Sequence, residues 1–205
     1  MHSSKYFSIG KKSAKKKTIM NNPITELKKG FSGDVLNDQK TLDENSRDAS
    51  IFEVKPSIVA FPKNYQDVQH LVNFTNKNPG FSLTARAAGT DMTGGPLTES
   101  IVVSFTKYLN HIKKLDEKSA TVEPGVYYRD LEKQMNKKNV MFPSYPASKS
   151  LCAMGGIIAN NSGGEKSLVY GQTVNHVNRI KAVLSDGKIY ELKKLELGTW
   201  NLENS

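Results

Sequence analysis

The chain has 205 residues, of which 37% are hydrophobic and 24% are charged. This length allows one sizeable core or two small lobes, and no segment approaches the roughly eighteen apolar residues that a membrane-spanning helix needs. The net charge of +9 would suit a nucleic-acid partner, but residues 1–25 hold six lysines and no acidic residue, which leaves +3 for the other 180 residues. The excess charge therefore lies in a tail, and nucleic-acid binding by the body is not expected.

Residues 1–22 are predicted to form a basic, disordered tail, because a lysine-rich segment with few apolar residues cannot bury a core. Adhesion to RNA or anionic lipid and a transit peptide remain alternatives for this tail. A secretory signal is not expected, since no apolar segment follows the lysines. The single cysteine, Cys152, fits a reducing compartment, so we expect a cytoplasmic protein, with peripheral membrane contact as the alternative. The scattered histidines predict no metal site.

Residues 23–49 are interpreted as a polar lead-in with a short helical candidate, and the folded body is predicted to begin near Ser50. The segment "PSIVAFP" predicts a strand over residues 58–61. Asn64 follows in the position of a helix N-cap, and apolar residues at helical spacing come after it. "NPG" ends this helix, and "FSLTAR" alternates as a strand does.

The second half of the chain predicts further strands and one helix. "SIVVSF" is an apolar strand candidate, and "ATVEPG" ends another strand in a turn. Residues 126–139 predict an amphipathic helix with Tyr128, Leu131 and Met135 on one face. "RIKAVLSDGKIYEL" predicts a β-hairpin with Asp-Gly in its turn. Strands and helices mix irregularly and without internal repeats, which indicates the α+β class.

Two segments, "RAAGTDMTGG" at 86–95 and "GGIIANNSGG" at 155–164, have almost no large side chains. Glycine lets a ligand approach the backbone closely, and successive N–H groups can hold phosphate oxygens. Neither standard nucleotide motif fits. "GGEKS" places Glu165 between glycine and lysine, unlike a Walker A loop, and "AGTDMTGG" runs into Pro96 and a strand rather than opening a helix. A tight turn explains either segment alone, whereas both together indicate a phosphate or dinucleotide site.

Six segments carry a family resemblance, in order: "RDASIFEVKPSIVAFPKNYQDVQHLV", "RAAGTDMTGG", "VEPGV", "FPSYPAS", "MGGIIANNSGG" and "YGQTVNHV". From about Asp48 to Leu192 the chain resembles the PCMH-type, or vanillyl-alcohol-oxidase-like, FAD-binding domain of the FAD-linked oxidases. The resembled branch holds D-lactate dehydrogenases and glycolate oxidase subunits. This resemblance implies two small α/β subdomains with the cofactor between them, over residues 50–197, and a short tail at 198–205.

The resemblance also implies how FAD is held. The first segment would bind the pyrophosphate through backbone and hydroxyl groups, with Arg86 either a phosphate cation or a structural brace. No histidine stands near "RAAGT", so FAD is expected to be bound without a covalent link. The implied cofactor residues are Arg86, Ala87, Ala88, Gly89, Thr90, Asp91, Gly94, Gly95, Pro124, Gly125, Val126, Gly155, Gly156, Asn161, Ser162, Gly163, Tyr170, Gly171 and Val177.

Several other residues have a functional and a structural interpretation. For Cys152 a small buried packing residue is favoured over a reactive thiol. For His176 a surface or structural role is favoured over an acid or base. Tyr145 fits a turn between prolines as well as a position near the flavin ring. Asn160 and Asn161 fit turn positions with positive φ, and the resemblance favours a cofactor role for Asn161.

The function implied by the resemblance is oxidation of a 2-hydroxy acid, such as D-lactate or glycolate, by hydride transfer to FAD. Relatives continue into a second domain that supplies substrate-binding and catalytic groups, whereas this chain stops at Ser205. No catalytic residue is therefore nominated, and we expect a fragment, a truncated product or one piece of a split enzyme that needs a partner subunit. A non-catalytic flavin-binding module is the alternative. Nucleic-acid binding through the lysine tail is a third, weaker hypothesis.

Overall fold

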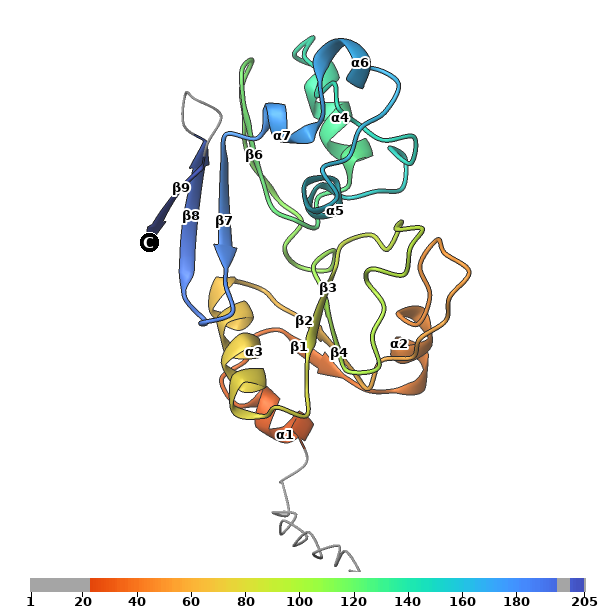
Figure 1. Ribbon diagram of the computed structural model, residues 1–205, viewed down its shortest axis with the longest axis vertical. Coiled ribbons are helices and arrows are strands. Elements are labelled where there is room, and N and C mark those ends of the chain that lie inside the picture. The colour runs from red at the N-terminus through yellow and green to blue at the C-terminus, as the bar shows by residue number, and fades with distance from the viewer. Residues whose placement is uncertain (1–22, 195–199, 205) are drawn as a thin grey trace, which may run out of the picture.

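The computed structural model describes residues 23–194 and 200–204, so the predicted basic tail lies outside the described residues. Strands and helices build two parts arranged along the long axis (Figure 1), which confirms the predicted α+β fold of two subdomains. The elements in chain order are α1 (Pro23–Lys28), β1 (Asp34–Leu36), α2 (Gln39–Glu44), β2 (Ile58–Phe61), α3 (Tyr65–Lys77), β3 (Leu83–Arg86), β4 (Ile101–Ser104), β5 (Ile112–Leu115), β6 (Ala120–Val122), α4 (Tyr128–Asn136), α5 (Met154–Ala159), α6 (Ser167–Tyr170), α7 (Thr173–His176), β7 (Arg179–Val183), β8 (Ile189–Lys194) and β9 (Trp200–Asn204).

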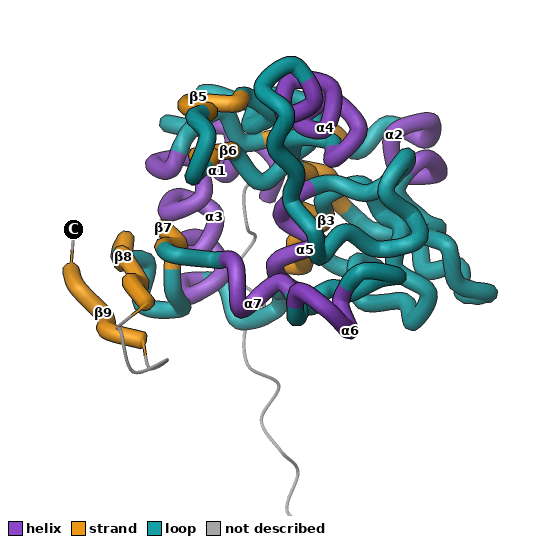
Figure 2. Tube along the Cα trace, turned by 90° about the horizontal axis from the view of Figure 1, so that it is seen from above, coloured by secondary structure: helices purple, strands orange, loops and turns teal. Residues whose placement is uncertain are grey.

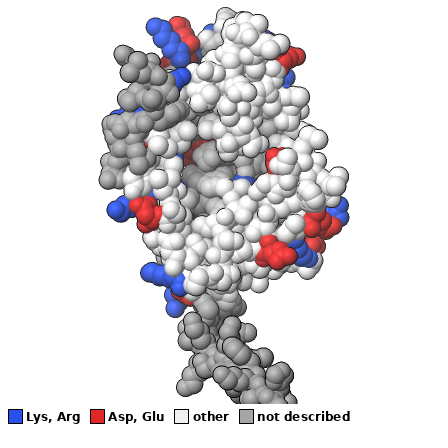
Figure 3. Space-filling model, viewed as in Figure 1, with Lys and Arg blue, Asp and Glu red and all other residues white. Residues whose placement is uncertain are grey.

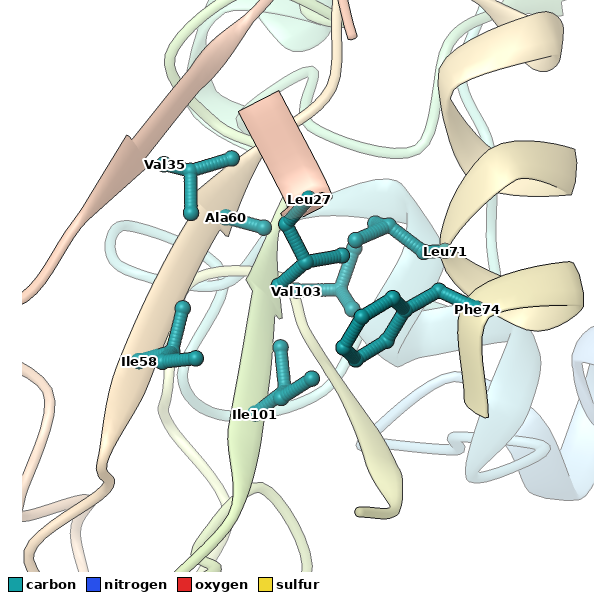
Figure 4. Packing of buried hydrophobic residues seen from close by; sticks show 8 residues of the cluster. All are labelled: Leu27, Val35, Ile58, Ala60, Leu71, Phe74, Ile101 and Val103. Carbon is teal, nitrogen blue, oxygen red and sulfur yellow. The ribbon is translucent and has the colours of Figure 1, made fainter. Parts of the chain in front are cut away.

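The first part is a four-stranded sheet in the order β1-β2-β4-β3, in which only β1 is antiparallel to its neighbour. β4 is buried along its whole length, as its apolar residues Ile101, Val102 and Val103 predict. α3 begins after Asn64, whose side chain accepts a hydrogen bond from the Asp67 N–H at 2.8 Å, so the predicted N-cap is confirmed. Leu71 and Phe74 of α3 point toward the sheet (Figure 4) and close the first core.

The lead-in belongs to this first core, contrary to the prediction that the folded body begins near Ser50. Leu27 of α1 and Val35 of β1 are both buried in the core cluster (Figure 4). β1 also extends the sheet, since Asp34 pairs with Phe61 at the end of β2. The buried apolar residues of the lead-in stand singly among mostly polar residues. The sequence there has no apolar periodicity long enough to predict that they are buried.

The second part has its own core, which forms around α4, α5 and the β5-β6 hairpin. The predicted helix over residues 126–139 is confirmed as α4, which is shorter at both ends. Tyr128, Leu131 and Met135 are all buried, as their spacing predicted. The first and second hydrophobic cores are therefore separate clusters of buried residues, one in each part of the molecule.

A third sheet, β7-β8-β9, lies beside α3 (Figures 1 and 2). The predicted hairpin is confirmed, and Gly187 occupies its turn at φ +77°. Two side chains of α3 hold this turn: Gln69 donates to the Gly187 carbonyl and Asn76 to the Ser185 carbonyl, each at 2.8 Å. β9 pairs with β8, so residues 200–204 form a strand and not the predicted tail.

Two properties of the described residues bear on function. None of the helices there is long and apolar enough to cross a membrane. No group of three or more histidine, cysteine, aspartate or glutamate side chains gathers there in an arrangement that would hold a metal ion.

Candidate functional site

A cleft of about 460 Å³ lies between the first and second parts. The molecular surface is hollowed between these parts, with charged side chains mainly at the periphery of this face (Figure 3). Small and apolar residues dominate the lining, which suits a ligand that approaches the backbone. The lining residues are Ala85, Ala87, Ala88, Gly89, Thr90, Asp91, Met92, Thr93, Gly95, Pro96, Pro146, Ser148, Cys152, Ala153, Gly156, Ile157, Ala159, Asn160 and Ser162.

The first glycine-rich segment connects β3 to β4 and forms one wall of the cleft. β3 and β4 are parallel neighbours in the sheet. The chain leaves the carboxyl end of β3 and must return along the sheet to the amino end of β4, which requires a long connection. Residues 87–90 line the cleft at the start of this connection. Within the part of the chain that the structure describes, their backbone N–H groups donate no hydrogen bond. Four successive free donors on small residues are suited to phosphate oxygens.

The residues that follow in the same loop form hydrogen bonds with one another instead. The Asp91 carboxylate accepts hydrogen bonds from the Thr93 hydroxyl and the Gly95 N–H, both at 2.7 Å, and from the Thr93 N–H at 3.2 Å. The Thr93 hydroxyl and these N–H groups lower the pKa of Asp91. A Cβ at Gly95 would lie 2.9 Å from the Asp91 carboxylate. The Asp91 side chain and Gly95 therefore maintain the shape of the loop.

Arg86 lies beneath the loop and does not line the cleft. Its Nη2 donates to the Arg47 carbonyl at 2.7 Å, and Nη1 is buried without a hydrogen-bond partner among the residues that the structure describes. Burial lowers the pKa of Arg86, while the nearby Asp48 charge partly offsets this effect. At Gly89, where φ is +68°, a Cβ would lie 2.3 Å from Arg86 Nη2. Of the two interpretations of Arg86, the geometry supports the brace.

The second glycine-rich segment forms the opposite wall through the short helix α5. Gly156 faces the first loop, since a Cβ there would lie 3.8 Å from the Ala87 Cβ. Gly155 instead packs against the turn at residues 124–126, where its N–H donates to the Pro124 carbonyl at 2.8 Å. A Cβ at Gly155 would lie 2.9 Å from that carbonyl oxygen. The two adjacent glycines thus have different roles, one at the cleft and one in packing.

Eleven of the sequence-predicted cofactor residues do not line the cleft. The 124–126 turn lies behind α5, and Val126 is buried in the second core. Asn161 has φ +46°, and its side chain bonds Gln172 and the Val174 N–H. His176, as favoured, has a structural contact, its Nε2 lying 2.9 Å from the Tyr170 carbonyl. The predicted residues outside the lining are Arg86, Gly94, Pro124, Gly125, Val126, Gly155, Asn161, Gly163, Tyr170, Gly171 and Val177.

The predicted residues within the lining are Ala87, Ala88, Gly89, Thr90, Asp91, Gly95, Gly156 and Ser162. The sequence interpretation missed the connection before α5, which contributes Pro146, Ser148, Cys152 and Ala153. Its signal was present in "FPSYPAS", a matching segment from which no site residue was chosen. Asn160 also lines the cleft, one position before the predicted Asn161.

Cys152 is buried, with 4% of its surface exposed, as the packing interpretation expected. Burial raises the pKa of its thiol, so less of the reactive thiolate forms near neutral pH than for an ordinary cysteine. We expect slow alkylation of Cys152 by iodoacetamide in the folded chain and complete alkylation in urea. Mass spectrometry of the alkylated protein measures both. Equal rates in the two states would contradict the buried position.

The FAD binding domain family matches residues 56–193 of this chain. The chain belongs to this family. The cofactor of this FAD-binding domain is FAD, and the cleft fits it: a row of free N–H groups on small residues suits the pyrophosphate, and apolar side chains of α5 and the preceding connection suit a ring system.

Three relatives of this FAD-binding domain illustrate its family. D-2-hydroxyglutarate dehydrogenase of Escherichia coli is 30% identical over 179 residues, which are 85% of this chain and 18% of the relative. Glycolate oxidase subunit GlcD of Bacillus subtilis is 31% identical over 141 residues, 67% of this chain and 30% of the relative. D-lactate dehydrogenase of Archaeoglobus fulgidus is 31% identical over 150 residues, 72% and 32% of the two chains. The chain thus spans between 18% and 32% of the length of these relatives.

Solved structures share the fold of this FAD-binding domain. Alkyldihydroxyacetonephosphate synthase superimposes with a TM-score of 0.72 at 22% identity, over 86% of this chain and 35% of that one. 6-Hydroxy-D-nicotine oxidase from Arthrobacter nicotinovorans gives 0.71 at 21% identity, over 81% and 37%. At these identities the likeness establishes the fold alone.

Proposed function

We propose that this chain is the FAD-binding portion of a flavin-dependent oxidoreductase that oxidises a small 2-hydroxy acid, with FAD held without a covalent bond. The observation that carries the proposal is that residues 87–90 line the cleft, near Gly156, and that their N–H groups donate no hydrogen bond within the described residues. The names of the relatives, which include glycolate oxidase and D-lactate dehydrogenase, support the substrate class.

The contribution of this chain is to bind and orient the cofactor. Bound FAD supplies the acceptor for the hydride that leaves the hydroxyl-bearing carbon of the substrate. The N–H groups of residues 87–90 hold the pyrophosphate, and the small side chains of both walls allow its close approach. Ala153 and Ile157 of the opposite wall line the cleft with apolar atoms and are themselves packed in the protein, which keeps this wall rigid.

The titratable side chains that line the cleft are poorly suited to remove the substrate's hydroxyl proton. Asp91 has a lowered pKa and a carboxylate occupied by the loop. Cys152 has a raised pKa and is buried. We therefore propose that the catalytic base, and the cation for the substrate carboxylate, come from a part of the enzyme outside these 205 residues or from a partner subunit.

An absorbance spectrum of the purified, folded chain tests the cofactor proposal. We expect a flavin spectrum, either as isolated or after incubation with FAD, and release of all the flavin on heat denaturation because no covalent bond holds it. Chromatography of the released material identifies FAD. A folded chain that stays colourless after incubation with FAD would overturn the proposal and favour a module that no longer binds its cofactor.

A further inference from the structure

A segment near the amino terminus lies along the back of the first loop. We call residues 47–52 the clasp segment. It is bonded to the loop through main-chain atoms at two points: Arg86 Nη2 donates to the Arg47 carbonyl at 2.7 Å, and the Ala49 N–H donates to the Asp91 carbonyl at 2.9 Å. These bonds join residues about forty positions apart, so they fix the loop against a distant part of the chain.

Asp48 makes the side-chain connection between the clasp segment and the loop. One carboxylate oxygen, Oδ2, accepts a hydrogen bond from the Gly94 N–H at 3.1 Å. The other, Oδ1, accepts from the N–H and hydroxyl of Ser50, which holds the carboxylate in place. Phe52 then packs on Gly94, where a Cβ would lie 3.1 Å from the ring. Glycine at φ +83° permits both contacts.

The charge of Asp48 also has a partner behind the loop. The Asp48 carboxylate raises the pKa of Arg86, whose burial otherwise lowers it. Asp48 does not line the cleft, and neither does Arg86. The two charges therefore lie outside the lining of the cleft.

The loop consequently divides into two halves with different hydrogen bonding. The N–H groups of residues 93–95 are held by the carboxylates of Asp48 and Asp91. Within the described ranges 23–194 and 200–204, the N–H groups of residues 87–90 donate no hydrogen bond, and these residues line the cleft. We infer that holding residues 93–95 through the two carboxylates keeps the N–H groups of residues 87–90 available to a ligand.

We propose that Asp48 is a positioning residue of the FAD site, which holds the first loop in the conformation that presents the N–H groups of residues 87–90 to the pyrophosphate. This proposal rests on the proposed function. A purely electrostatic effect has the opposite sign, because removing a negative charge near an anionic ligand tightens its binding. The direction of the change therefore separates positioning from charge repulsion.

The test compares the full chain with Asp48→Ala, Asp48→Asn and a control, Asp116→Ala. Asp116 likewise accepts two backbone N–H bonds, from Lys118 and Ser119, but in the turn between β5 and β6 and away from the cleft. FAD titration at a temperature at which every variant is folded gives the dissociation constants. Hydrogen exchange of the Thr93 and Gly95 amides without FAD reports the conformation of the loop, because these amides are bonded to Asp91 and not to Asp48.

We expect about tenfold weaker FAD binding for Asp48→Ala, because the loop loses a charged hydrogen-bond acceptor. Asp48→Asn keeps one acceptor oxygen, which can accept from the Gly94 N–H or from Ser50 but not from both, so it should recover only part of the affinity. Asp116→Ala binds as the unaltered chain does. Exchange should quicken in the loop of Asp48→Ala only. Unchanged or tighter binding by Asp48→Ala would overturn the positioning role. If the unaltered chain binds no FAD, the proposed function fails, and unchanged loop exchange in Asp48→Ala would then refute the clasp separately.

Discussion

Gly89→Val is expected to remove most of the FAD-binding capacity of a chain that still folds. Gly89 has φ +68°, which a β-branched residue adopts only under strain. Its Cβ would lie 2.3 Å from Arg86 Nη2, and the guanidinium is held by the Arg47 carbonyl. The loop must therefore shift, and the row of donors at residues 87–90 loses its alignment. We expect binding to weaken by about tenfold or more, measured as flavin released per folded protein.

Gly80→Val is the matched control for this substitution. Gly80 follows α3, and a Cβ added there would have no other atom within 4 Å. Its flavin content should equal that of the unaltered chain, and circular dichroism should show both variants folded. Normal flavin content in a folded Gly89→Val chain would refute the assignment of the first loop to the pyrophosphate.

Asp67→Ala is expected to destabilise the first core by about 3 kcal/mol, because it removes a buried, charged acceptor that several hydrogen bonds share. The Asp67 side chain, which is 2% exposed, accepts hydrogen bonds from the Ser32 N–H, the Ser32 hydroxyl and the Lys63 N–H, all at 2.8 Å. These bonds hold the connection before β1 against the start of α3. Urea denaturation measures the change in the free energy of unfolding.

Asp130→Ala provides the comparison for Asp67→Ala. Asp130 is exposed on α4 and pairs with Lys133 at 3.4 Å. The loss of such a surface pair should change the free energy of unfolding by less than about 0.5 kcal/mol. Similar losses for the two variants would mean that Asp67 does not organise the packing of the lead-in.

The regular parts of this fold could be predicted from the sequence, since their periodicity reflects burial. The α4 face, the Asn64 N-cap and the hairpin turn at Gly187 each rest on contacts within a few residues. The role of the lead-in could not be predicted. Its single buried residues, such as Leu27 and Val35, are recognised only once β1 pairs with β2.

The candidate site shows the same distinction between local and distant causes. The free donors of residues 87–90 could be expected from a sequence without large side chains. The different roles of Gly155 and Gly156 could not, because they depend on whether Pro124 or Ala87 lies opposite. Nothing in the composition of residues 47–52 indicated that Asp48 would reach Gly94, since that bond spans 46 positions.

The separation of the two hydrophobic cores has a consequence for how the molecule unfolds. Each core closes over its own residues, and the walls of the cleft belong to different cores: the first loop leaves the sheet of one, and α5 supplies Met154 and Ile157 to the other. A ligand that binds only when both walls are folded lowers the free energy of that joint state. Bound FAD therefore couples the unfolding of the two cores, because it stabilises each core only while the other is folded.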